Sequence, residues 1–276
     1  MNTMSSSVIM EGYNSRKRRY IITVSLLGVI VFLLAGFMMM YGKTIYSPVD
    51  IFKILFSDGS AAGSFTVKTL RLPRMLAAVL CGFAFGAAGN VFQKLLGNPL
   101  ASPDIIGVSS GASVAAIFGI LIFRLDGTVV SLIAVLCGIA ISALIYIIAN
   151  GNGYSDSKLI LTGIGMNAFL NAIISWLLLK ASEYDVGSAL RWMSGSLNNV
   201  TLDQIPKLAI VVIGASIAVA VLNGHLKVME LGDSYATVLG VRLSAVRISL
   251  IVLAVLMIAF ATAVTGPIAA VAFLSG

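Results

Sequence analysis

Long apolar runs alternate with short polar connections along almost the whole chain. A bilayer core of ~30 Å requires about 20 residues of apolar helix, and seven runs approximately reach that length. These runs are residues 20–41, 73–96, 105–123, 128–149, 159–179, 207–223 and 246–265. An eighth run begins with Gly266-Pro267 and ends with the chain at Gly276. The pattern predicts an all-α polytopic membrane protein with seven complete spans and the start of an eighth.

The composition agrees with this prediction. Apolar residues make up 59% of the chain and charged residues 11%, and the mean hydropathy is +1.02. Soluble domains carry roughly 25% charged residues, so this chain lacks the polar groups that cover a water-facing surface. Cys81 and Cys137 each lie inside an apolar run, and their spacing indicates neither a disulfide framework nor a metal site. We interpret both thiols as packing residues.

Basic residues indicate the orientation of the chain. Residues 16–19, Arg-Lys-Arg-Arg, directly precede the first apolar run, which is typical of a cytoplasmic membrane flank. That run is about 22 residues long, whereas a signal peptide has an apolar core of ~7–15 residues, so we expect it to remain as the first helix. We therefore expect a cytoplasmic tail over 1–19 and one transmembrane domain over 20–276. The other basic residues are scattered over short connections, so the net charge of +7 does not indicate nucleic-acid binding.

Three connections are too long to be simple turns: 42–72, 180–206 and 224–245. In the first, Ser47-Pro48-Val49-Asp50 predicts the start of a short surface helix with a serine cap and proline at its first position. The second is polar and aromatic together.

The connection 224–245 predicts a short helix of about six residues, with Asp233 as its N-cap and Gly240 just past its end. Apolar residues recur there at helical spacing, namely Val228, Leu231, Tyr235 and Val238. Such a helix is too short to span a bilayer. We expect it to lie across the cytoplasmic surface and to insert its apolar face into a partner; the alternative is a surface helix folded against its own bundle.

Residues 107–111, Gly-Val-Ser-Ser-Gly, fit the G-x-S-x-G pattern of a serine hydrolase. A nucleophile at Ser109 would need a base, and the one histidine of the chain, His225, lies in a polar connection. We therefore expect no catalytic residue, although an intramembrane serine protease that uses Ser109 and His225 is the main rival interpretation.

A structural interpretation of 98–111 fits better. Pro99 and Pro103 break a helix, and Gly107 and Gly111 permit irregular backbone or close packing. Ser102 and Asp104 can cap the helix that follows. A broken helix start is tolerated at membrane depth only when it packs within protein or lines a water-filled space. Both a transport pathway and plain packing remain open.

Nucleotide binding by this chain is not expected. Residues 36–44, GFMMMYGKT, have five residues between the two glycines, where a phosphate-binding loop has four, and no strand precedes them. If transport consumes ATP, another subunit must bind it. We expect no cofactor or metal on this chain.

The segment RLPR places Arg71 and Arg74 three residues apart around Pro73, at the start of a span. Both are expected to face outward at the helix mouth. They could reach lipid headgroups or dock an acidic protein through paired arginine–carboxylate contacts.

Residues 71–113, RLPRMLAAVLCGFAFGAAGNVFQKLLGNPLASPDIIGVSSGAS, resemble the FecCD permease family of iron–siderophore ABC importers, which also includes vitamin B12 and haem permeases. Four later segments resemble the same family in the same order: LILTGIGMNAFLNAIISWLL, ALRWMSGSLNNVT, LGDSYATVLGVRLSAVR and TGPIAAVAFLSG. The resemblance covers residue 20 to the end and implies a type II importer fold, like that of the vitamin B12 permease. The RWMSGSLN segment is most similar to members that carry ferric siderophores; haem or vitamin B12 are the alternatives.

The resemblance also implies site residues. The helix that couples the permease to its ATPase would comprise Leu231, Gly232, Asp233, Ala236, Leu239 and Gly240. Arg71 and Arg74 would dock the extracytoplasmic substrate-binding protein. A cytoplasmic gate would lie in 151–157, at Gly153, Ser155 and Ser157. The broken helix start, lining or shaping the pathway, would comprise Asn98, Pro99, Pro103, Gly107, Ser109, Ser110 and Gly111.

The implied assembly contains ATPase subunits carrying ATP and Mg²⁺, a substrate-binding protein and a second permease subunit, in the cytoplasmic membrane of a bacterium. The family has ten spans, in which helices two to five and seven to ten form related halves, and 98–111 and 266–276 are faint counterparts of each other. We therefore expect this chain to be a truncated product or fragment. A seven-helix receptor, a further rival based on helix count, would require an outside N-terminus, which residues 16–19 oppose.

Overall fold

A computed structural model describes residues 3–57, 63–125, 127–151, 153–268 and 271–274. The described residues form helices and connections, with one isolated bridge between Gly151 and Gly153. The principal helices are α1 (Thr3–Met40), α2 (Pro48–Phe56), α3 (Leu72–Leu95), α4 (Val108–Leu121), α5 (Gly127–Asn150), α6 (Asp156–Lys180), α7 (Glu183–Met193), α8 (Gln204–Met229), α9 (Asp233–Val238), α10 (Leu243–Thr265) and α11 (Val271–Leu274). A π-helical segment, η1 (Phe65–Arg71), precedes α3, and a 3₁₀ turn, η2 (Pro103–Ile106), precedes α4. The all-α prediction is confirmed.

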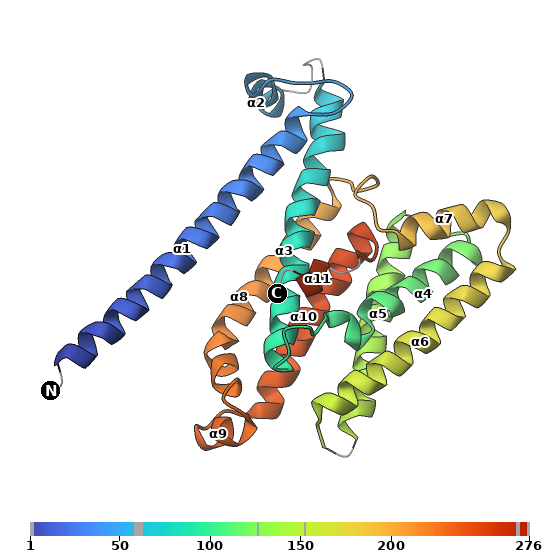
Figure 1. The fold of residues 1–276 in the computed structure, drawn as a ribbon. Coiled ribbons are helices and arrows are strands. Elements are labelled where there is room, and N and C mark those ends of the chain that lie inside the picture. Colours follow the sequence, from blue (N-terminus) through green and yellow to red (C-terminus); the bar gives the residue numbers. More distant parts are fainter. Residues whose placement is uncertain (1–2, 58–62, 126, 152, 269–270, 275–276) are drawn as a thin grey trace. The chain divides into compact units, whose positions relative to one another are not determined.

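The chain divides into two compact units within α3, after Met75. The first unit, residues up to Met75, contains α1, α2 and η1 (Figure 1). Met39, Ile51, Ile54 and Val67 form its small buried core. The predicted helix start in 42–72 is confirmed: the Ser47 hydroxyl accepts from the backbone N–H of Asp50, and the Asp50 carboxylate accepts from the backbone N–H of Ser47, which is a capping box.

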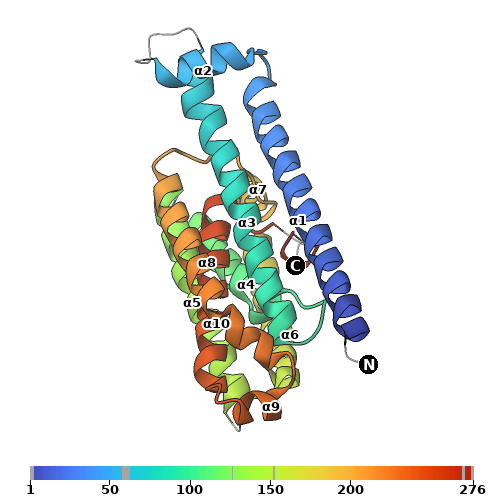
Figure 2. The ribbon, with the colours of Figure 1, turned by 90° about the vertical axis from the view of Figure 1, so that its left-hand side faces the viewer.

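The second unit, from Leu76 onward, is a helical bundle around α10. This helix packs against α8 on one side and α5 on the other, and it also contacts α4 (Figures 1 and 2). Most of the apolar window of α10 is buried, whereas α6 and α8 expose large apolar residues such as Leu161, Leu179, Ile210 and Val221. A central buried helix surrounded by helices with apolar outer faces is the arrangement expected in a bilayer.

Six helical segments of the described residues are long and apolar enough to cross a membrane: Gly12–Met40, Phe65–Leu95, Gly127–Asn150, Asp156–Lys180, Gln204–Met229 and Leu243–Thr265. The remaining predicted span, 105–123, is shorter than predicted. Pro103 begins η2, and Gly107, which adopts a left-handed backbone (φ 73°), separates η2 from α4, so α4 has 14 residues. Two helices also extend beyond the predicted runs: α1 begins at Thr3, within the predicted tail, and α8 continues to Met229.

Candidate functional site

The short helix α9 has the length that its sequence predicts, and backbone geometry defines both of its ends. Gly232 precedes it with φ 105°, and Gly240 follows with φ 81°, both left-handed values that favour glycine. The N–H of Gly240 bonds the carbonyl of Thr237, and the N–H of Val241 bonds the carbonyl of Ala236. This pair of bonds is a Schellman motif, so the predicted role of Gly240 as the residue past the helix end is confirmed.

One face of α9 rests on its own bundle and the other is exposed. The Ala236 side chain is fully buried, whereas Val238 is 86% exposed. Leu231, Tyr235 and Leu239 are also exposed. The helix therefore presents an apolar surface, here called the α9 outer face and comprising Leu231, Tyr235, Val238 and Leu239. Ala236, which the family resemblance placed in the coupling helix, lies in α9 and faces the bundle.

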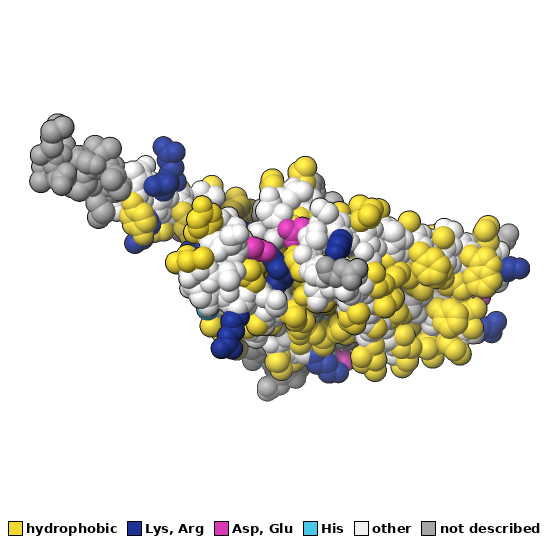
Figure 3. All heavy atoms as spheres, turned by 90° about the horizontal axis from the view of Figure 1, so that it is seen from below, with side chains coloured by type: hydrophobic (Ala, Val, Ile, Leu, Met, Phe, Trp, Pro, Cys, Tyr) yellow, Lys and Arg dark blue, Asp and Glu magenta, His cyan; other side chains and the backbone are white. Residues whose placement is uncertain are grey.

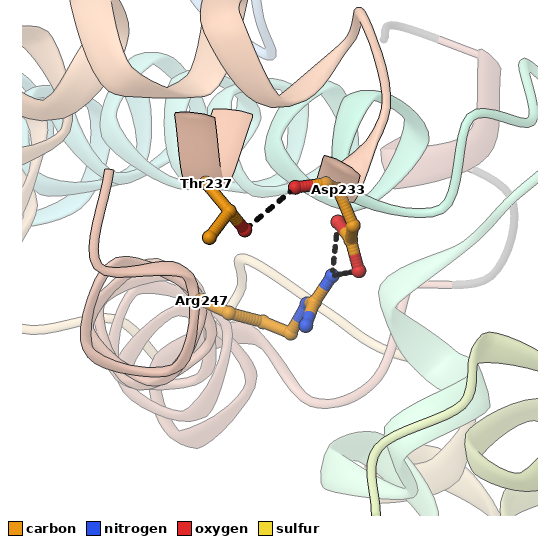
Figure 4. A network of polar contacts seen from close by, with 3 residues as sticks. All are labelled: Asp233, Thr237 and Arg247. Atoms are coloured by element: carbon orange, nitrogen blue, oxygen red, sulfur yellow. Dashed lines mark hydrogen bonds and ion pairs between the residues drawn. The ribbon is translucent and has the colours of Figure 1, made fainter. Parts of the chain in front are cut away.

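Asp233 binds an arginine and does not cap α9. The first helical residue is Asp233 itself, and its side chain makes no cap bond because Arg247 of α10 donates from Nη2 to both carboxylate oxygens, at 3.0 and 3.1 Å (Figure 4). The N-cap prediction for Asp233 is thus wrong in detail: Gly232 holds that position. The Thr237 hydroxyl donates to the Asp233 carbonyl within α9. The Arg247 side chain is 8% exposed and that of Asp233 is 58% exposed.

Arg247 also touches the connection between α5 and α6. Its guanidinium carbon lies 3.9 Å from the centroid of the Tyr154 ring, within range of a cation–π interaction. Tyr154 is flanked by Gly153, with φ 88°, and by Ser155, which precedes α6 without a side-chain cap bond. Burial and the neighbouring Asp156 raise the pKa of Tyr154, so its ring stays neutral. Two of the proposed gate residues, Gly153 and Ser155, are thus direct neighbours of the arginine contact; Ser157 is exposed in the first turn of α6.

A second ion pair lies beside α9. Lys94, at the end of α3, is 3.5 Å from Glu230, which follows α8, and both side chains are partly exposed. Figure 3 views the end of the molecule at which α9 lies, and acidic and basic side chains are close together there while hydrophobic side chains cover the flanks. At this end of the second unit, α9 packs against α8 and α10, the end of α3 reaches Glu230 just before α9, and the α5–α6 connection reaches Arg247.

A polar network holds the broken helix start of α4. Ser102 caps η2 by accepting from the N–H of Asp104. Ser109 donates to Asp104 Oδ1 at 2.6 Å, and Ser110 donates to Asn167 Oδ1. Asn167, from α6, donates in turn to the Asp104 carbonyl at 2.8 Å. The predicted capping is therefore confirmed for Ser102, which caps η2, and wrong for Asp104: Gly107 separates η2 from α4, α4 begins without a side-chain cap, and the Asp104 carboxylate accepts from the Ser109 hydroxyl instead.

The break lies well inside the bundle. Asn167 is eleven residues into α6, which corresponds to about 16 Å from its start at 1.5 Å per residue. A β-carbon at Gly107 would meet Ile145 at 2.7 Å, and one at Gly111 would meet Ile141 at 2.9 Å, so both glycines pack closely against α5. Irregular backbone at this depth is thus covered by neighbouring helices, as a membrane interior requires.

The connection that leads to the break begins at Asn98 and Pro99, which are exposed. The Asn98 side chain accepts from the N–H of Leu100 at 2.9 Å, which fixes a turn after α3. Pro103 is buried and starts η2. The segment thus passes from an exposed turn into the core within a few residues.

Arg71 is not at an outward-facing helix mouth. It is 8% exposed, and its guanidinium donates to the carbonyls of Met39, Met40 and Thr44 at 2.7, 2.9 and 2.5 Å and lies over the Tyr46 ring. Carbonyls in the last turn of a helix have no partner within the helix, and they carry the negative end of its dipole. Arg71 therefore binds the end of α1. The expectation of outward exposure is wrong for Arg71; Arg74 is half-buried.

The pair that serine hydrolysis would require is not supported. The Ser109 hydroxyl donates to Asp104, and His225 is exposed in the last turns of α8 and not in a polar connection, because α8 continues to Met229. Asn167, Tyr154 and Arg247 were not singled out from the sequence. Little in the sequence pointed to Arg247, because a basic residue near the start of a membrane helix can simply reach the interface.

Comparison with known proteins adds to this geometry. Residues 20–276 match the FecCD transport family. Over 234 residues the chain is 37% identical to the ferric enterobactin transport system permease protein FepG of Escherichia coli K12, covering 85% of this chain and 71% of FepG. It is 32% identical over 268 residues to the Fe(3+)-citrate import system permease protein YfmE of Bacillus subtilis 168, covering 96% of this chain and 80% of YfmE.

A further relative is the achromobactin transport system permease protein CbrC of Dickeya dadantii 3937, with 32% identity over 85% of this chain and 68% of CbrC. Among solved structures, a metal-chelate type ABC transporter in an inward-facing conformation superposes with a TM-score of 0.80 at 24% identity, covering 93% of this chain and 79% of that one. This likeness shows that the two chains share a fold.

Proposed function

Because this chain belongs to the FecCD transport family, we propose that it is the membrane-spanning subunit of an ATP-driven importer that carries a ferric siderophore across the cytoplasmic membrane. Its family makes it a multi-pass membrane permease and not an enzyme. The interpretation as a serine protease is therefore set aside, and so is that as a seven-helix receptor.

The substrate class is inferred from the relatives. Three of them are named for ferric enterobactin, achromobactin and ferric citrate, so an iron chelate is the cargo that these likenesses favour. Haem and vitamin B12 are the alternative cargoes. The iron is substrate here, and ATP and Mg²⁺ belong to the partner ATPase.

The observation that supports an ATPase partner most directly is the α9 outer face. Two large exposed side chains, Tyr235 and Val238, lie on a six-residue helix that is fixed to its own bundle through Ala236 and Asp233, and two more, Leu231 and Leu239, flank it. A helix this short gains little from exposing such residues to water, and aromatic and aliphatic anchors of this kind dominate protein interfaces. Docking of the α9 outer face in a groove of the ATPase would cover them.

Docking of the ATPase on α9 also suggests the orientation of the chain and the places of the other partners. The α9 end of the second unit would face the cytoplasm, which agrees with the basic residues 16–19 before the first span. The connection 151–157 would then form part of the cytoplasmic gate. Arg74 is the remaining candidate for docking the substrate-binding protein, and a second permease subunit would complete the pathway.

The test is iron uptake in cells that produce the chain with its ATPase and binding protein. Cells with and without this chain are given radioactive iron as a catecholate siderophore, a hydroxamate siderophore or citrate, and haem and vitamin B12 serve as comparison cargoes. We expect uptake of one ferric siderophore to depend on the chain. If only haem or vitamin B12 uptake depends on the chain, that compound is the cargo and the siderophore assignment is wrong. If the uptake of no cargo depends on the chain, the proposed import function is contradicted.

Orientation is tested separately. Single cysteines replace Ser157 and Val238, both exposed, and react with a membrane-impermeant thiol reagent. Labelling in inside-out vesicles but not in intact spheroplasts is the expected result, and the reverse pattern would invert the proposed topology. Val49, exposed on α2, gives the matched position for the opposite side.

A further inference from the structure

Arg247 contacts both Asp233 of α9 and Tyr154 of the α5–α6 connection. We propose that Arg247 is a positioning residue that transmits the displacement of α9 to the α5–α6 connection, so that docking and movement of the ATPase reposition the gate. This inference rests on the proposed function, because it assumes that α9 receives the ATPase.

The geometry of the arginine suits transmission. Its side chain is buried, and its two partners occupy different groups on it: Asp233 takes Nη2, and the Tyr154 ring lies against the plane of the guanidinium. A guanidinium can use its edge and its face at once because it is planar and rigid. Asp233 cannot move without pulling on Nη2, and the guanidinium cannot shift without changing its contact with Tyr154.

The backbone on both sides of the contact can follow such a shift. On one side Gly232 and Gly240 flank α9, and a β-carbon at either would meet no atom within 4 Å. On the other side Gly153 precedes Tyr154, again with open space around it. Both elements joined by Arg247 are therefore short, with glycines on both sides of α9 and on the α5 side of Tyr154, whereas Arg247 itself lies on α10, the buried central helix.

The contact leaves one donor of the arginine unused. Arg247 Nε is buried and has no hydrogen-bond partner among the described residues. Buried polar groups are normally satisfied, so a donor that is unpaired in this conformation is available to a partner when the contact rearranges.

The test uses membrane vesicles that contain the permease, its ATPase and its binding protein. Three quantities are measured: binding of the ATPase, ATP hydrolysis, and cargo transported per ATP hydrolysed. For Arg247→Met we expect ATPase binding and hydrolysis to persist while transport per ATP falls about fivefold or more, the lower end of typical coupling between sites. Tyr154→Ala should give the same loss, and Tyr154→Phe, which keeps the ring, should recover most of it.

Lys94→Met is the matched control, because it removes an ion pair next to α9 that does not reach the α5–α6 connection. Wild-type transport per ATP in both Arg247→Met and Tyr154→Ala would overturn the inference. Loss of ATPase binding in Arg247→Met together with normal transport in Tyr154→Ala would also overturn it, since Arg247 would then only hold α9 in place. Failure of the unaltered chain to bind an ATPase would instead contradict the proposed function.

Discussion

Gly163 of α6 lies so close to the backbone carbonyl of Ile105 in η2 that a β-carbon at Gly163 has no space. The contact joins the middle of a long membrane helix to the 3₁₀ turn before α4. It explains how an irregular segment can be held at membrane depth: the turn fits against a helix surface that lacks a side chain at that point, which is a common way for helices to approach closely in lipid.

Replacing Gly163 with Ala should therefore destabilise the second unit. The β-carbon would displace backbone, so we expect a loss of about 1–3 kcal/mol or more, seen as a lower Tm of the protein purified in detergent. Gly165→Ala is the control on the same helix, because a β-carbon there meets no atom within 4 Å. Equal Tm values for the two variants would contradict the packing described.

Replacing Arg71 with Ala should loosen the end of α1. Three backbone carbonyls lose their donor, and leaving a buried acceptor unpaired costs about 1–3 kcal/mol. We expect faster proteolysis of residues 41–47 in membranes. Arg74→Ala should leave that rate unchanged but weaken binding of the substrate-binding protein. If instead Arg71→Ala weakens this binding and Arg74→Ala speeds proteolysis, Arg71 is the docking residue.

Replacing Leu231 and Val238 with Asp should weaken binding of the ATPase. Truncating or charging a central interface anchor typically costs 2 kcal/mol or more, about thirtyfold in affinity. Co-purification of the ATPase from membranes measures the effect. Val49→Asp, at an exposed apolar position on α2, should have no effect, and retention of the ATPase by the Leu231/Val238 variant would show that α9 does not dock it.

Replacing Ser109 with Ala should leave uptake largely intact. The variant loses one hydrogen bond to Asp104, worth about 0.5–1.5 kcal/mol, and the expected change is a small drop in Tm. Asp104→Ala removes the acceptor of both the Ser109 and the Ser102 hydroxyls and should lower Tm further. Complete loss of transport in Ser109→Ala with an unchanged Tm would give this hydroxyl a direct role.

Much of the fold could be predicted because local chemistry determines it. The Ser47–Asp50 capping box and the end of α9 at Gly240 both follow from a few adjacent residues, and the long spans follow from apolar length alone. The length of α4 could not be predicted in the same way. An apolar run continues from 105 to 123, but Gly107 interrupts the helix, and a glycine in a membrane span does not by itself predict a break.

The side-chain contacts could be predicted least. Arg71 looked exposed because it stands at the start of an apolar run, yet the end of α1, some thirty residues earlier in the chain, supplies its acceptors. Arg247 and Tyr154 are more than ninety residues apart in sequence. Such contacts arise from tertiary packing, so no local sequence pattern predicts them.

The way in which α9 is attached has a mechanical consequence. Its ion pair to the bundle, Asp233 with Arg247, lies at its first residue, while its last turn ends in a glycine and its most exposed side chain, Val238, is near that far end. Between these two points Ala236 is fully buried against the bundle. A load applied to Val238 would tilt the helix about Ala236, so Asp233 at the other end would be displaced and would pull the Arg247 guanidinium with it.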